Sequence, residues 1–181
     1  MTTKNLLRRA FNRLLHLAAR TGPGAATFRP FLHRMRGVKV GRHVWIGDDV
    51  YLENEYPERV ELADGCILGI RATIIAHTRG PGHIVIERNA SVGPGAVVVC
   101  VSGQTLRIGE GAVISIGAVV TKSVPPRMIV APPRSLPVAK ASISLSQAET
   151  IEEFIRGIEP LPPSGRQNGV VATTPEQQAA G

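Results

Sequence analysis

Residues 86–98 read Ile-Glu-Arg-Asn-Ala-Ser-Val-Gly-Pro-Gly-Ala-Val-Val, and an aliphatic residue returns at every sixth position, at Ile86, Val92 and Val98. The same step recurs in four groups of three. The twelve anchors are Val40, Ile46, Leu52, Leu62, Leu68, Ile74, Ile86, Val92, Val98, Ile108, Ile114 and Val120. Neither an α-helix nor an ordinary strand has a reason to keep a six-residue period. The period predicts a coil with three flat faces, in which each hexapeptide is a short strand followed by a corner.

A second series of mostly small residues lies four positions after the anchors. Its members are Val44, Val50, Cys66, Ala72, Ala90, Ala96, Ala112 and Ala118. A small side chain suits the inside of a corner, where a bulky one would not fit. Two phased series over more than eighty residues make an accidental match to the repeat improbable.

The steps between the four groups are longer, and each one follows the third anchor of its group. The longer connections are therefore expected to leave the coil at the same corner and to stack along one edge. The longest lies between Ile74 and Ile86 and holds His77 and His83, two of the five histidines. Loops on a rigid scaffold often carry chemistry, so this loop is predicted to be functional.

The repeat, the corner Ile74-Ile75-Ala76-His77 and the closing segment Gly117–Pro126 resemble the hexapeptide-repeat acyltransferases. This family includes sugar, serine and antibiotic O-acetyltransferases, and the resemblance covers about residues 36–134. It implies an all-β fold, a left-handed parallel β-helix of about four coils, with helices at both ends of the chain. It also implies a homotrimer with sites between subunits, which uses acetyl-CoA or another acyl-CoA to acylate a small hydroxylated acceptor such as a sugar.

The resemblance implies that His77 is the general base that deprotonates the acceptor hydroxyl, which then attacks the thioester directly. Imidazole suits this task near neutral pH. The neighbouring corner of the preceding coil carries Glu53, Asn54 and Glu55. We expect a carboxylate of this corner to orient the imidazole, with Glu55 as the first choice and Glu53 left open, and Asn54 to hold the acceptor hydroxyl. His83 is the competing base or a substrate contact.

For the acyl donor, the resemblance implies contacts between coenzyme A and backbone amides at Gly117 and Ala118. Lys122, Arg127 and Arg134 are the candidate phosphate contacts. The chain departs from the family at two points. It has Ile116-Gly117-Ala118 where relatives have Ala-Gly-Ser, and residues 131–134 read Ala-Pro-Pro-Arg where relatives often have Pro-Ala-Lys. These departures leave an acyl carrier protein open as an alternative donor.

A metal enzyme of the γ-carbonic-anhydrase type is an alternative that uses the same coil. It would need three histidines around one ion. Only His43, His77 and His83 lie within the coil, and His43 follows a first anchor whereas His77 follows a third. The two are predicted at different corners of one chain, so no metal is expected within a chain, while convergence across a subunit boundary stays open.

The basic character of the chain is concentrated at its start. Ten of the 21 Lys and Arg residues precede Asp48, and no Asp or Glu does. Within the predicted basic helical cap, residues 1–37, a helix over residues 5–20 has an apolar stripe at helical spacing. The stripe consists of Leu7, Phe11, Leu14, Leu15 and Ala18. We expect this stripe to cover the open first coil. The alternative is a scaffold or membrane-associated protein whose basic helix makes peripheral contact with an anionic membrane.

The remaining boundaries follow from composition. Residues 38–134 are predicted to form the acyltransferase domain, and residues 135–159 an extension with a short helix after a capping box at Ser146 and Glu149. Residues 160–181 are predicted to be a disordered tail. No long apolar run, signal sequence or nucleic-acid motif is recognised, so we expect a cytoplasmic protein, with no nucleic-acid partner.

Overall fold

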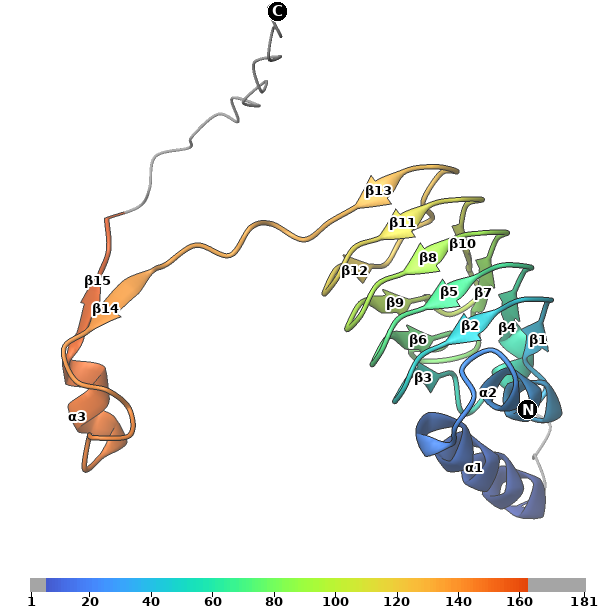
Figure 1. The fold of residues 1–181 in the computed structure, drawn as a ribbon, viewed down its shortest axis with the longest axis horizontal. Coiled ribbons are helices and arrows are strands. Elements are labelled where there is room, and N and C mark those ends of the chain that lie inside the picture. The colour runs from blue at the N-terminus through green and yellow to red at the C-terminus, as the bar shows by residue number, and fades with distance from the viewer. Residues whose placement is uncertain (1–5, 163–181) are drawn as a thin grey trace, which may run out of the picture. The chain divides into compact units, whose positions relative to one another are not determined.

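The computed structural model describes residues 6–162 of the chain (Figure 1). They belong to two compact units, and the boundary along the chain lies between Pro133 and Arg134. The first unit is a parallel β-helix of about four turns with flanking helices, which confirms the predicted left-handed parallel β-helix as the fold class. Of the predicted disordered tail, residues 160–181, all but the first three lie outside the described residues.

Three parallel sheets form the faces of the coil. Sheet A contains β1 (Lys39–Val40), β4 (Val60–Leu62), β7 (His83–Ile86) and β10 (Thr105–Ile108). Sheet B contains β2 (Trp45–Ile46), β5 (Ile67–Leu68), β8 (Ser91–Val92), β11 (Val113–Ile114) and β13 (Ile129–Val130). Sheet C contains β3 (Tyr51–Leu52), β6 (Thr73–Ile75), β9 (Val97–Val99) and β12 (Val119–Val120). Anchors pair with anchors, as Ile46 with Leu68 and Leu68 with Val92.

The predicted interior is confirmed. Every anchor except the half-buried Val40 is buried, as are all eight members of the small series. The spacing between turns is tight at the glycines that follow anchors: a Cβ on Gly69 would lie 2.5 Å from the backbone nitrogen of Pro94 on the next turn. The three longer connections run from sheet C to sheet A, so they share one corner as the sequence predicted.

Two helices, α1 (Leu6–Thr21) and α2 (Phe28–Met35), lie against the first turn (Figure 1). They do not cover it with the predicted apolar stripe, since Phe11 and Leu14 are more than half exposed. That expectation was wrong. The first turn of a parallel coil presents unpaired backbone groups, which need hydrogen-bonding partners rather than apolar cover. The loop and helices supply them: Ile46 N donates to Ala25 O at 2.8 Å.

The side of the helices that faces the coil is therefore small and polar. His16 and Ala19 of α1 and Arg29, Leu32 and His33 of α2 are buried. Burial and the nearby Arg36 guanidinium lower the pKa values of His16 and His33 to about 3, so both imidazoles are neutral near pH 7. Arg8, Arg9, Arg13 and Arg34 are exposed on the outside of the cap, whereas Arg29 and Arg36 are buried.

The second unit is a small hairpin in which β14 (Ala139–Ala141) pairs antiparallel with β15 (Ile158–Pro160), with α3 (Ile151–Arg156) between them. The helix begins at Thr150, whose hydroxyl accepts a hydrogen bond from Glu153 N at 3.1 Å. The capping box predicted at Ser146 and Glu149 was therefore displaced by four residues. A threonine directly before the helix satisfies its first amides more directly.

Candidate active site

His77 lies in the loop between β6 and β7, where the sequence predicted the functional connection. The loop is held tightly, because His77 forms a backbone bridge with Pro81, and Gly82 N donates to Ala76 O at 2.7 Å. The imidazole side chain is 29% exposed. It is held by the loop and is partly exposed to solvent.

The carboxylate of Glu53 contacts this imidazole. Its two oxygens lie 2.8 and 2.9 Å from His77 Nδ1 and also accept hydrogen bonds from the backbone amides of Ala76 and Glu55. A carboxylate only accepts hydrogen bonds, so Nδ1 carries the proton and Nε2 keeps its lone pair in the neutral imidazole. Among the described residues, none forms a hydrogen bond with Nε2. This arrangement is suited to taking a proton from a hydroxyl at Nε2.

Glu53 is fully buried, and Arg36 holds its segment in place. The guanidinium of Arg36 donates to the carbonyls of Leu52 at 3.2 Å and Glu53 at 2.6 Å, and also to Asn12 Oδ1 on α1. Burial lowers the pKa of Arg36 to about 10, which leaves it charged at neutral pH, and the nearby Glu53 opposes that shift. The helical cap and the site are therefore joined through one buried cation.

Glu55, which was expected to orient the imidazole, forms no hydrogen bond or ion pair with His77. It forms an exposed ion pair with Arg9 at 3.1 Å, so the structure assigns the orienting contact to Glu53. The sequence places Glu53 and Glu55 at the same corner, and its six-residue period does not distinguish which of the two carboxylates reaches His77. The chain turns into η1 (Pro57–Arg59), and the Glu53 side chain folds inward beneath the histidine loop.

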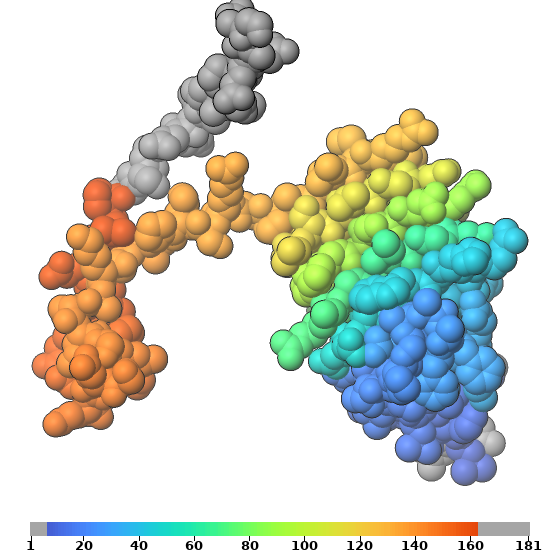
Figure 2. All heavy atoms as spheres, in the orientation of Figure 1, coloured from blue at the N-terminus to red at the C-terminus, as the bar shows by residue number. Residues whose placement is uncertain are grey.

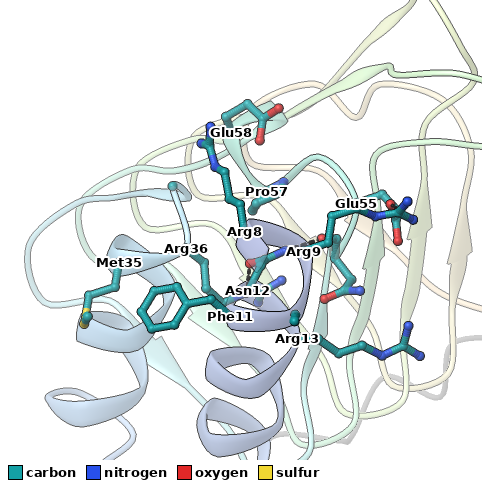
Figure 3. A pocket seen from close by; sticks show the side chains of 13 residues that line it. Arg8, Arg9, Phe11, Asn12, Arg13, Met35, Arg36, Glu55, Pro57 and Glu58 are labelled. Atoms are coloured by element: carbon teal, nitrogen blue, oxygen red, sulfur yellow. Dashed lines mark hydrogen bonds and ion pairs between the residues drawn. The ribbon is translucent and has the colours of Figure 1, made fainter. Parts of the chain in front are cut away.

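Asn54 faces the helical cap. Its carbonyl accepts a hydrogen bond from Asn12, and its Oδ1 is buried without a hydrogen-bond partner in the described chain. Together with Phe11, Met35 and several arginines it lines a cavity of about 530 Å³ between the helices and the loop that follows Glu53 (Figure 3). The predicted contact of Asn54 with an acceptor hydroxyl beside His77 is therefore not evident from this geometry.

His83, the competing base, lies on β7 of sheet A. Its Nε2 is 3.2 Å from Glu61 Oε1, and a hydrogen bond from Lys39 holds the pKa of Glu61 below its usual range. Nε2 of His83 already faces a carboxylate, whereas Nε2 of His77 does not. The geometry therefore favours His77 as the base.

The residues predicted to bind the acyl donor lie elsewhere on the coil. Gly117 and Ala118 form a corner between sheets B and C, and their amides already donate to Pro94 O and Ser115 O. Lys122 and Arg127 are exposed near the last turn, while Arg134 begins the second unit. The corner of Gly117 differs from the corner of His77, so one chain does not bring the two sets together.

The histidines named for a metal site are also apart. His43 lies at the corner between sheets A and B, with φ at +55°, and His77 lies at the corner between sheets C and A. Across the part of the chain that the structure describes, no group of three His, Cys, Asp or Glu side chains is arranged to hold a metal ion.

Comparison of the chain with protein-family models finds no match, and no curated protein matches it. Within residues 6–162 no helix has the length and apolarity needed to cross a membrane. The features that bear on function are therefore the β-helix and the pair formed by His77 and Glu53.

Proposed function

We propose that the protein is an acyl-CoA-dependent O-acyltransferase that transfers an acetyl group to a hydroxyl of a sugar or another small metabolite. The observation that carries the proposal is the contact between His77 Nδ1 and the fully buried Glu53. A carboxylate in this position selects the tautomer in which Nε2 is the base, and it stabilises the imidazolium that forms when the base takes a proton.

In the proposed reaction, Nε2 of His77 removes the proton of the acceptor hydroxyl as the oxygen attacks the thioester carbonyl. The tetrahedral intermediate collapses by breaking the carbon–sulfur bond. The thiolate of coenzyme A leaves and receives the proton from the imidazolium, which returns His77 to its neutral state. No acyl-enzyme forms in this reaction.

We further propose a homotrimer in which the donor site uses a second subunit. Two observations support it. The predicted donor corner at Gly117 is not the corner of His77, and the outer side of sheet B carries a row of apolar residues. Trp45, Ile67, Val113 and Ile129 are between 37% and 70% exposed in the single chain. Ser91 of β8 interrupts this row between Val113 and Ile67. Exposed apolar surface of this kind marks contact surfaces, and sedimentation equilibrium would give the mass of the assembly.

The proposal is tested by incubating the protein with acetyl-CoA and a panel of hydroxylated metabolites while thiol release is measured. With an active acceptor, His77→Ala is expected to lower turnover by about 10²–10⁴-fold without loss of the fold. His83→Ala is the matched control, and it should stay within a few-fold of the wild type. A folded His77→Ala variant with full activity would refute the assignment. Inertness with every short acyl-CoA would favour an acyl carrier protein as donor.

A further inference from the structure

The helical cap presents an apolar surface to solvent. Phe11, Leu14 and Leu17 of α1 and Phe28, Phe31 and Met35 of α2 are each between 43% and 65% exposed. We call these six residues the apolar helix face. On each helix the three residues fall within roughly one third of the circumference. Phe11 and Met35 line the same cavity and lie side by side in Figure 3, so the two rows adjoin.

The opposite side of both helices is fixed to the coil, so the apolar helix face cannot turn inward. Arg29 donates to Ile46 O at 3.0 Å and forms an ion pair with Asp48, and Arg20 pairs with Asp49. Arg36 ties α1 to the first turn through Asn12. In Figure 2 the two helices form the outer surface at this end of the coil. The contacts between the helices and the coil therefore keep the apolar helix face directed toward solvent.

Positive charge borders the apolar helix face. Arg8 and Arg13 on α1 are exposed, and neither helix contains an acidic residue. Arg34 on α2 is also exposed, but its guanidinium donates to the carbonyls of Val40 and Gly41 on the coil. A row of exposed aromatic and aliphatic side chains flanked by arginines is the pattern of a helix that lies in a membrane interface. Two copies of this surface would bring their arginines together, so self-association through it is disfavoured by like-charge repulsion.

We propose that the apolar helix face docks on an anionic lipid bilayer, with the apolar side chains between the headgroups and the arginines on their phosphates. The inference is independent of the chemistry at His77. The attraction between arginines and anionic lipid is screened by salt, and the apolar contact is not, so binding needs both parts and weakens as salt is added.

The test uses the full chain in sedimentation with vesicles of phosphatidylcholine alone or mixed with phosphatidylglycerol. We expect binding to the mixed vesicles that falls with added salt, and little binding to phosphatidylcholine alone. The double variant Leu14→Gln and Phe31→Gln should bind at least about tenfold more weakly, because both apolar side chains are lost from the contact. Both positions are exposed, so its thermal unfolding should match that of the wild type.

Leu136→Gln with Val138→Gln is the matched control, because it removes two equally exposed apolar residues from the second unit. It should bind vesicles as the wild type does. Failure of the wild type to bind mixed vesicles, or full binding by the Leu14 and Phe31 double variant, would overturn the proposal. The proposal would also be overturned if the wild type did not bind vesicles and the double variant formed a smaller assembly than the wild type. The apolar helix face would then be a contact between copies of the chain.

Discussion

Replacing Glu53 with glutamine tests the site more sharply than removing the histidine does. The substitution keeps the size of the side chain and removes one of its two acceptor oxygens. In the structure, Oε1 accepts from the amides of Glu55 and Tyr56, and Oε2 accepts from the amide of Ala76. Both oxygens lie within 2.9 Å of His77 Nδ1. The NH₂ group of a glutamine must therefore face at least one backbone N–H, which then loses its acceptor.

The two possible orientations of the glutamine have different consequences. If its oxygen stays with Glu55 N and Tyr56 N, that oxygen remains 2.9 Å from His77 Nδ1, while the NH₂ group takes the place of Oε2 at 2.8 Å. The NH₂ group then competes by donating to Nδ1, which favours the tautomer with the proton on Nε2. That tautomer has no lone pair available for the acceptor hydroxyl. If the glutamine flips, two backbone amides lose their acceptor. The first orientation leaves only the amide of Ala76 without its acceptor, so we expect it to dominate.

The magnitudes follow from these contacts. One buried donor without a partner costs about 1–3 kcal/mol, so Glu53→Gln should lower the free energy of unfolding by that amount. Loss of the general base should lower turnover by about 10²–10⁴-fold, which is about 3–5 kcal/mol in the activation barrier. The affinity for acetyl-CoA should change little, because the donor does not contact Glu53 in the proposed reaction.

The assay is thiol release for kcat and KM, with urea unfolding of the same preparations. Glu55→Gln is the control, since it removes a carboxylate from an exposed ion pair, a change worth about 0–1 kcal/mol. It should keep wild-type activity within a few-fold. Wild-type turnover in a folded Glu53→Gln variant, or an equal loss in Glu55→Gln, would refute the argument that Glu53 orients the base.

Two further predictions concern the cap and the coil. The folded pKa values of His16 and His33 are about 3 against an ordinary 6.5, so the unfolded chain binds protons between these values that the folded chain does not. Stability should therefore be complete above pH 6.5 and decline by about 2 kcal/mol per histidine at pH 5, and urea titrations showing no decline would contradict this. Gly69→Ala should cost about 3 kcal/mol, because its Cβ would overlap Pro94, whereas Gly95→Ala, with open space and φ of +64°, should cost about 1 kcal/mol. Equal unfolding midpoints for the two variants would contradict this prediction, because they would show that the coil shifts to accommodate the Cβ at position 69.

The sequence predicts the coil well because the period is a local property. Each anchor and each small residue occupies the interior of its own hexapeptide, so the pattern can be read without knowing the neighbours. The corner of His77 follows from the same count. The partner of His77 does not, because Glu53 turns inward through contacts with Arg36 and Ala76, which are distant in sequence and match no period.

The orientation of α1 shows a different limit of sequence reasoning. An apolar stripe normally indicates the buried side of a helix, yet here the buried side carries Asn12, His16 and Ala19. The rule assumes that the partner surface is apolar. The end of a β-helix is an exception, since the last strand of each sheet presents a row of unpaired backbone N–H and C=O groups. Arg29 and Arg36 donate hydrogen bonds to carbonyls of the coil, whereas the ring nitrogens of His16 have no hydrogen-bond partner among the described residues. The apolar residues of the helices are left for another contact.

These two features are connected by Arg36. The residue donates to Asn12 on α1 and to the carbonyl of Glu53, the carboxylate beneath His77. A movement of the cap would therefore pull directly on the segment that sets the tautomer of the base. The N-terminal helices are thus part of the support of the site as well as a cover for the coil. If the apolar helix face meets a bilayer, Arg36, which directly follows α2, would link the surface that holds the protein on the membrane to the segment of Glu53.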